Sequence, residues 1–229
     1  MRLIEINDKE FCKESAKVIA DELQELQGKF DHINVALSGG STPIPILKEL
    51  KESNLKWEQF DFFLVDERCV PVNNEESNYK NLKECFFNYI NSRSHPIIKD
   101  DNIDLDQLVS EYNNLVDRLV IREKDGVPSF DLVILGMGED GHTASLFPET
   151  EGLSDYENNY ICNYVPKLES YRITMTYRLI NNADKIIILT KGDAKRRIFK
   201  KIKENVKYYP MNKVFYCGQP LTWIMDKLV

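Results

Sequence analysis

The stretch INVALSGGSTPIPILKEL, from Ile33 to Leu50, combines the signals of a strand, a turn and a helix. Its first five residues form a short, mainly apolar run with β-branched side chains, which is typical of a buried strand. Two glycines and hydroxyl residues follow, and Pro43 suits the first turn of a helix, where its missing N–H is not needed. The stretch therefore predicts a strand from about Ile33 to Leu37, a glycine turn and a helix that opens near Thr42.

The same alternation recurs along the chain. Asn7 and Asp8 are suited to cap a helix that runs to about Gln27. The segment FDFFLVDERCVP, from Phe60 to Pro71, is a second apolar strand that ends in charge. Further strands are expected at 132–135, 185–190 and 213–217, and further helices within 73–90, within 105–123, after Gly192 and around Trp223.

Strands that alternate with helices predict an α/β fold. We expect a Rossmann-like three-layer α/β/α sandwich with a mostly parallel central sheet, in a single domain that covers residues 1–229. No internal repeat or low-complexity linker divides the chain.

Composition excludes several classes of protein. The formal net charge of −7 provides no basic field for nucleic acid or an anionic membrane, so neither is expected as a partner. The N-terminal residues become polar too soon for a signal peptide, and no apolar run approaches about 18 residues. The five cysteines are scattered without a CxxC pair, which predicts free thiols. These features favour a cytoplasmic protein.

Three of the expected strands end in unusual sequence: LSGGSTP, DERCVP and GMGEDGH. The carboxyl ends of parallel strands meet at one edge of a sheet, and ligands of α/β proteins bind there. We therefore expect the chemistry of this protein at the place where the three stretches converge.

The first of these stretches suits an anion. Its glycines permit close backbone approach, and the N–H groups of the helix start that follows are a suitable site for a phosphate. It is neither a P-loop nor a dinucleotide fingerprint, and a tight turn with a serine cap is the alternative. The candidate binding residues are Ser38, Gly39, Gly40, Ser41 and Thr42.

The second stretch places Asp66, Glu67 and Arg68 directly after an apolar strand. Side chains alternate along a strand, so at least one carboxylate is expected to point inward, where it needs a partner. Arg68 is a candidate for that partner, or for bidentate contact with a phosphate. A simple salt bridge at the strand end is the alternative.

The third stretch, GMGEDGHTASLFP from Gly136 to Pro148, carries His142. Gly138 and Gly141 allow a loop that folds over a ligand, and Asp140 is placed to orient the imidazole or to hold a substrate hydroxyl. His142 can take up a proton near neutral pH, which makes it a candidate general base. No GxSxG motif surrounds Ser145, and no second histidine lies at the spacing of a metal site.

Two basic residues complete the candidate site. Arg172 lies in YRITMT, and Lys195 follows a predicted strand at a helix start, which places it near the crevice. The other basic residues of that helix are expected to form a solvated face. His32 and His95 lie in ordinary polar surroundings, and we expect both at the surface.

These motifs occur in the order found in 6-phosphogluconolactonases. LSGGSTP, VDERCVP, SNYK, GMGEDGHTASLFP, RIT and GDAK resemble that family over nearly the whole chain, with the weakest similarity between about Asn91 and Pro128. The resemblance implies hydrolysis of 6-phospho-D-glucono-1,5-lactone to 6-phosphogluconate, without a metal or organic cofactor, by a monomer or weak homodimer. It implies that His142 is the base and that Asp66 and Asp140 line the ring end of the pocket. It also implies that the Ser38–Thr42 loop, Arg68, Arg172 and Lys195 hold the phosphate.

Two alternative functions are compatible with part of the sequence. Glucosamine-6-phosphate deaminases resemble this chain in a glycine loop and a DGH motif, but they read DGHIAFNEP where this chain reads DGHTASLFP. The acid that assists their histidine has no counterpart in Ser145-Leu146-Phe147. A sugar-phosphate-binding module without turnover is the second alternative.

Overall fold

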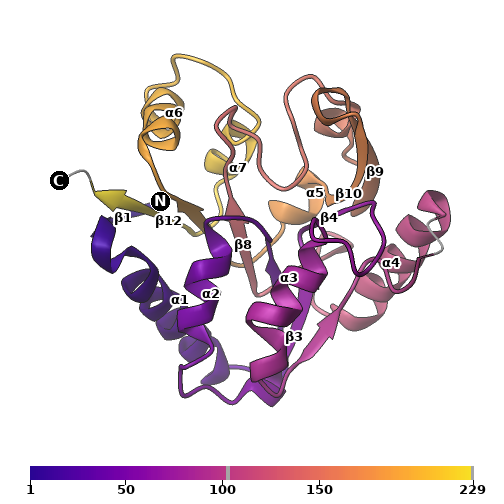
Figure 1. Ribbon diagram of the computed structural model, residues 1–229, viewed down its shortest axis with the longest axis horizontal. Coiled ribbons are helices and arrows are strands. Elements are labelled where there is room, and N and C mark those ends of the chain that lie inside the picture. Colours follow the sequence, from indigo (N-terminus) through magenta and orange to yellow (C-terminus); the bar gives the residue numbers. More distant parts are fainter. Residues whose placement is uncertain (102–103, 228–229) are drawn as a thin grey trace.

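The computed structural model describes residues 1–101 and 104–227 (Figure 1). Within these residues the central sheet has seven strands, and all neighbouring strands run in parallel. The strand order is β1 (Arg2–Asn7), β12 (Leu221–Lys227), β11 (Ile186–Thr190), β8 (Leu132–Gly136), β2 (Ile33–Leu37), β3 (Phe60–Leu64) and β5 (Arg93–His95). Every residue of β2, β3 and β11 is buried, as expected for strands covered on both faces. The predicted α/β class is confirmed.

Helices flank both faces of this sheet. The chain moves in one direction from β1 through β2 and β3 to β5, and right-handed crossovers place the helices of these connections on one face. These helices are α1 (Phe11–Gln27), α2 (Pro43–Leu50) and α3 (Asn78–Cys85), which contact one another in sequence (Figure 1). The connections that run the opposite way contain α4 (Leu105–Leu119) and α6 (Asp193–Lys203).

The order of strands reverses beside β2. From β2 the chain proceeds to β3 on one side, whereas β8 pairs with β2 on the other side. The Ser38 N–H extends this second pairing by donating to the Ile134 carbonyl at 3.0 Å. In open α/β sheets such a reversal leaves a crevice beyond the carboxyl ends of the two strands. The glycine loop after β2 and the histidine loop after β8 form its two sides.

A second, antiparallel sheet begins where the charged strand end was predicted. Residues 60–68 do not form one strand: Val65 separates β3 from β4 (Asp66–Arg68). The Val65 N–H donates to Leu37 of the central sheet at 2.9 Å, while its carbonyl accepts from Met175 at 2.8 Å. β4 pairs with β10 (Ser170–Met175), which pairs with β9 (Tyr160–Val165). One residue thus joins the two sheets.

The C-terminal prediction was wrong in its order of elements. Most of the short helix α7 (Asn212–Phe215) lies in KVFYC, where a strand was expected, and Trp223 lies in strand β12 instead of a helix. The end of the stretch TWIMDKL, Leu228, lies outside the described residues. β12 lies between β1 and β11, where both of its edges are hydrogen-bonded, and the Trp223 ring packs on Phe199 and Phe215. The burial of the large ring between α6 and α7 favours the strand.

The remaining elements are short. They include the hairpin β6 (Glu123–Lys124) and β7 (Val127–Pro128), the helix α5 (Tyr177–Ile180) and several 3-10 turns. Among residues 1–101 and 104–227, no helix combines the length and the apolar character needed to cross a membrane.

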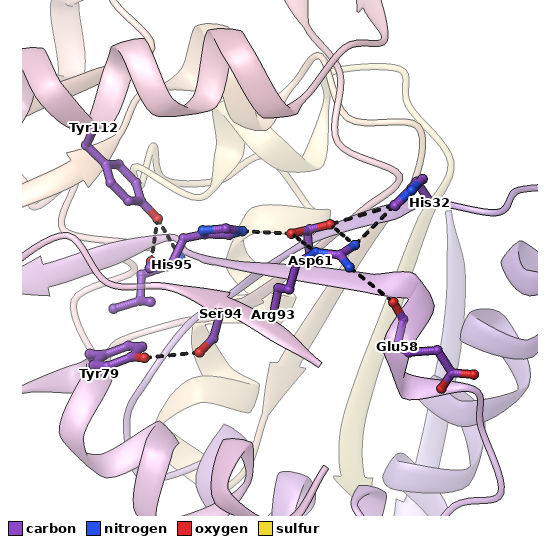
Figure 2. A network of polar contacts seen from close by, with 9 residues as sticks. His32, Glu58, Asp61, Tyr79, Arg93, Ser94, His95 and Tyr112 are labelled. Carbon is purple, nitrogen blue, oxygen red and sulfur yellow. Dashed lines mark hydrogen bonds and ion pairs between the residues drawn. The ribbon is translucent and has the colours of Figure 1, made fainter. Parts of the chain in front are cut away.

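The surface role expected for His95 was also wrong. Of the two histidines expected at the surface, His32 is exposed, with 72% of its side chain accessible to solvent, whereas 17% of the His95 side chain is accessible. The His95 ring lies 4.6 Å from the Phe63 ring, and its Nε2 is 2.8 Å from Asp61. Arg93 binds the same carboxylate and reaches His32, so one buried aspartate ties edge strand β5 to β3 (Figure 2).

The ionised form of Asp61 is the one that this network stabilises. Burial opposes ionisation, but hydrogen bonds from His95 and Arg93 outweigh it and hold the Asp61 pKa well below its usual range. Because the folded-state pKa is lowered, Asp61 contributes stability above the pKa of the unfolded chain, and this contribution is lost as pH falls.

We therefore expect Asp61→Asn to lower the free energy of unfolding by about 2 kcal/mol at neutral pH. The variant should also lose less stability than the wild type between about pH 5 and pH 3. Urea unfolding at several pH values measures both effects. Asp21→Asn, an exposed position on α1, is the matched control and should change stability by less than about 0.5 kcal/mol. Identical pH profiles for Asp61→Asn and the wild type would contradict the assignment.

Candidate active site

A cavity of about 510 Å³ lies at the carboxyl ends of β2, β3 and β8. It contains every site residue expected from the sequence except Gly141. These residues are Ser38, Gly39, Gly40, Ser41, Thr42, Asp66, Arg68, Gly138, Asp140, His142, Arg172 and Lys195. Gly141 faces away, and a Cβ added there would lie 2.6 Å from the Tyr209 ring. Gly141 therefore packs the back of the histidine loop.

The histidine loop is closed by its own hydrogen bonds. The Gly138 N–H donates to the His142 carbonyl at 2.9 Å, and the Thr143 hydroxyl donates to the Gly136 carbonyl at 2.9 Å. The Asp140 carboxylate accepts from both the backbone N–H and the ring of His142, with Nδ1 at 2.5 Å from Oδ1. The loop thereby fixes the imidazole relative to the strand end.

Asp140 is held in its charged form. Burial opposes ionisation, but the contacts with His142 and with Lys167, whose Nζ lies 3.0 Å from Oδ2, keep the Asp140 pKa well below its usual range. Because the Asp140 carboxylate can only accept a hydrogen bond, a neutral His142 imidazole must carry its proton on Nδ1. The lone pair of Nε2 then remains available to accept a proton.

The His142 ring also has an apolar neighbour. The Phe147 ring stacks on it, with centroids 3.8 Å apart and an interplanar angle of 22°. The ring is thus restrained in its plane by Asp140 and on one face by Phe147. A base held in this way needs little reorganisation before proton transfer.

The charged stretch after β3 divides its side chains between two faces. Asp66 and Arg68 line the cavity, whereas Glu67 between them is buried away from it. Asp66 accepts a hydrogen bond of 2.7 Å from Ser145, and Arg68 donates to the Glu76 carbonyl. Within the described part of the chain, Arg68 forms no ion pair with Asp66 or Glu67. The simple strand-end salt bridge is therefore not present.

Positive charge gathers in the same cavity as the histidine. Arg172 lies beside Arg68 in the antiparallel pairing of β10 and β4. In residues 1–101 and 104–227 neither guanidinium forms an ion pair with a carboxylate, although the charges of Asp66 and Glu76 act on Arg172. Burial lowers the pKa of Arg172, and the neighbouring Arg68 lowers it further. Burial likewise lowers the pKa of Lys195, whose Nζ reaches the Thr42 hydroxyl at 3.3 Å. A bound anion would relieve the cost of burying these cations.

The glycine loop supplies neutral donors in the same cavity. Among the described residues no side chain caps α2, which begins at Pro43, so the alternative of a serine cap is not found there. The first turn of α2 adds little to these donors, because Pro43 and Pro45 have no N–H and the Ile44 N–H donates to the Gly40 carbonyl at 3.2 Å. Backbone donors for an anion therefore come from the loop that precedes the helix. The Ser38 hydroxyl is buried without a hydrogen-bond partner among the described residues. Loop and cations together form a site suited to a phosphate.

The cavity lining also includes residues that were not among the predicted site residues, and four of them have polar or aromatic side chains that contact the site: Asn78, Ser145, Phe147 and Lys167. Ser145 and Phe147 lie in the recognised motif, but their roles depend on contacts with Asp66 and with the His142 ring. Lys167 follows β9, which reaches the site only through the second sheet. No spacing in the sequence indicates these contacts.

The described residues show no cluster of three or more histidine, cysteine, aspartate or glutamate side chains arranged to hold a metal ion. The cavity instead combines one imidazole, the three carboxylates of Asp66, Glu139 and Asp140, and several cations. Such a set can transfer a proton, bind hydroxyls and bind a phosphate.

Comparison with known proteins points to one family. Residues 6–223 match the family described as glucosamine-6-phosphate isomerases/6-phosphogluconolactonase. The chain is 30% identical to the 6-phosphogluconolactonase of Thermotoga maritima over 213 residues, which is 91% of each chain, and 34% identical to that of Haemophilus influenzae over 208 residues, which is 85% of each chain. It is 33% identical over 210 residues to the human GDH/6PGL endoplasmic bifunctional protein, covering 86% of this chain but only 26% of that protein.

Solved structures agree with this result. The crystal structure of the Thermotoga maritima 6-phosphogluconolactonase matches with a TM-score of 0.87 at 26% identity and covers 99% of both chains. The 6-phosphogluconolactonase of Trypanosoma cruzi also gives a TM-score of 0.87, at 25% identity over 99% of this chain and 94% of that one.

The close approach of Gly138 to the imidazole gives a test of the site geometry. A Cβ at Gly138 would lie 2.1 Å from His142 Cε1, whereas a Cβ at Gly136 would meet nothing within 4 Å. We expect Gly138→Ala to displace the imidazole and to lengthen its bond to Asp140. NMR spectra of the imidazole nitrogens measure this displacement, and Gly136→Ala, the matched control, should leave them unchanged. Equal spectra for the two variants would contradict the geometry.

Proposed function

The chain belongs to the glucosamine-6-phosphate isomerase/6-phosphogluconolactonase family, and we propose that it hydrolyses 6-phospho-D-glucono-1,5-lactone to 6-phospho-D-gluconate. The observation that carries this proposal is the arrangement of the cavity. His142, whose imidazole is oriented by Asp140, lines the same cavity of about 510 Å³ as the glycine loop. The partly buried cations of Arg68, Arg172 and Lys195 line this cavity too. A phosphorylated lactone has the two groups that this arrangement suits: an electrophilic carbonyl and a dianion.

In the proposed reaction His142 acts as general base. Nε2 accepts a proton from a water molecule while the water oxygen forms a bond to the lactone carbonyl carbon. The resulting oxyanion collapses, the ring C–O bond breaks, and the proton returns from the imidazolium to the leaving alkoxide. Asp140 stabilises the imidazolium through Nδ1. A lactone is reactive enough that no covalent intermediate with the enzyme is needed.

Phosphate binding is assigned to other residues of the cavity. Arg68, Arg172 and Lys195 supply charge, and the Ser38–Thr42 loop supplies hydroxyl and backbone donors. Asp66, oriented by Ser145, is suited to accept a hydrogen bond from a ring hydroxyl. Binding energy from the phosphate then positions the distant carbonyl at the base.

The deaminase alternative has less support. The segment after the DGH motif does not supply a second acid to the base: Ser145 is engaged with Asp66, and Phe147 covers one face of the imidazole. Ammonia release from glucosamine 6-phosphate tests this alternative. Binding of sugar phosphates without any turnover would favour the non-catalytic module.

The decisive experiment measures lactone hydrolysis coupled to 6-phosphogluconate dehydrogenase, read as NADPH slightly below neutral pH. The substrate also hydrolyses spontaneously, so the quantity to report is the rate of hydrolysis in excess of a protein-free control. A large excess supports the proposal, whereas a folded protein that gives no excess defeats it.

His142→Ala should reduce kcat by about 10²- to 10⁴-fold, because the variant lacks the base. The affinity for 6-phosphogluconate should stay within about threefold, because the cations and the glycine loop are unchanged. Coupled kinetics and calorimetric titration measure the two quantities. Equal losses of rate and affinity would contradict this division of roles.

Lys195→Ala should raise KM by about 10- to 100-fold, since it removes a charge-assisted contact with the phosphate. Its effect on kcat should be smaller. Lys201→Ala, an exposed position on the same helix, is the matched control and should leave KM unchanged. If both variants bind substrate like the wild type, the phosphate is held elsewhere.

A further inference from the structure

We propose that Glu67 is the positioning residue of this site: its buried carboxylate binds the start of α3 and so holds both the cationic strand end and the glycine loop in place. This inference deepens the proposed function and rests on it for the identity of the substrate. Glu67 is not among the described residues that line the cavity, so any effect on the substrate must act through its neighbours.

Glu67 has an unusual set of partners for a buried acid. Its side chain is 1% exposed. Oε1 accepts from the backbone N–H groups of Arg68 and Asn78, both at 2.7 Å. Oε2 accepts from the Tyr79 N–H at 2.8 Å and from the Ser77 hydroxyl at 3.2 Å. The four partners are all donors, so each oxygen is fully used as an acceptor.

These partners require a carboxylate. Two of the N–H groups belong to the first turn of α3, which favours negative charge. Burial raises the pKa of Glu67 above its usual value, although the three backbone N–H donors act in the opposite direction and favour the charged form. An amide in the same place would offer one acceptor oxygen and turn an NH₂ group toward two other donors. The position therefore distinguishes glutamate from the nearly isosteric glutamine.

The first consequence concerns the strand end. Alternation along β4 turns Glu67 away from the cavity and turns Asp66 and Arg68 toward it. The bond from the Arg68 N–H to Glu67 fixes the backbone from which the guanidinium extends. Loss of the carboxylate would free this strand end on the side that faces α3.

The second consequence concerns the glycine loop. By binding the Asn78 N–H, Glu67 places the Asn78 side chain between β4 and the loop. Asn78 Nδ2 donates to the Asp66 carbonyl at 2.9 Å. Its Oδ1 lies so close to Gly39 that a Cβ there would approach it to 2.3 Å. Asn78 thus transmits the position of α3 to the loop assigned to the phosphate.

The test compares Glu67→Gln with the wild type and with Leu82→Ala. Leu82 is fully buried on α3 outside the cavity, so its variant destabilises the same helix without altering the carboxylate. We expect Glu67→Gln to bind inorganic phosphate at least about tenfold more weakly and to raise KM for the lactone by a similar factor. Leu82→Ala should change each by less than about twofold at temperatures where it stays folded.

Amide hydrogen exchange gives a readout that does not depend on the substrate. In Glu67→Gln, exchange should accelerate at residues 66–68, 77–80 and 39–42 while the rest of the central sheet stays protected. In Leu82→Ala, acceleration should be confined to α3 and should leave residues 39–42 unchanged.

The outcomes separate the two proposals. If the wild type hydrolyses the lactone and Glu67→Gln matches it in KM, phosphate affinity and exchange at 39–42, the role of Glu67 is refuted and the function stands. If the wild type shows no lactonase activity, the proposed function fails. Phosphate affinity and exchange at residues 39–42 then still decide the role of Glu67. If Leu82→Ala loses as much phosphate affinity as Glu67→Gln, the carboxylate has only a structural role in α3, and the proposal is overturned.

Discussion

The parallel pairing of β2 with β8 on one side and β3 on the other is the constraint on which the site depends. Residues separated by a hundred positions reach one crevice only because the carboxyl ends of these three strands lie together. Hydrophobic burial fixes this pairing, since every residue of β2 and β3 is covered. The polar loops can therefore vary in sequence without changing where they begin, which is why chemistry collects at this edge.

Much of this arrangement could be predicted from the sequence because its signals are local. β2 occupies the range expected for it, and Pro43 opens α2 as its fixed backbone angle suggests. The convergence of the glycine loop with His142 followed from one topological rule. The roles of the site residues stay predictions, because placing a residue in a cavity does not establish what it does there.

Other features depend on contacts that no local pattern contains. Val65 ends β3 because its carbonyl pairs with β10, more than a hundred residues later. Trp223 lies in a strand because β12 pairs with β1 on one side and β11 on the other. The apolar residues around Trp223 are also compatible with helical spacing, so the local sequence does not decide between the two. His95 is covered because edge strand β5 carries it onto Phe63 and Asp61. In each case tertiary packing decided between local alternatives.

The seam between the two sheets has a mechanical consequence. His142 and the glycine loop extend from the central sheet, whereas Arg172 belongs to the antiparallel one. Val65, directly after β3, is hydrogen-bonded to both sheets. A second link is the hydrogen bond of 3.0 Å from the Ser145 N–H, in the histidine loop, to the Thr174 hydroxyl in β10. Further hydrogen bonds cross between the sheets, from the Tyr160 hydroxyl to the Leu64 carbonyl at 2.7 Å and from the Asn163 side chain to the Ser145 carbonyl at 2.8 Å. The distance between base and arginine is therefore set by the contacts at the seam between the two sheets, and not by the packing inside either sheet.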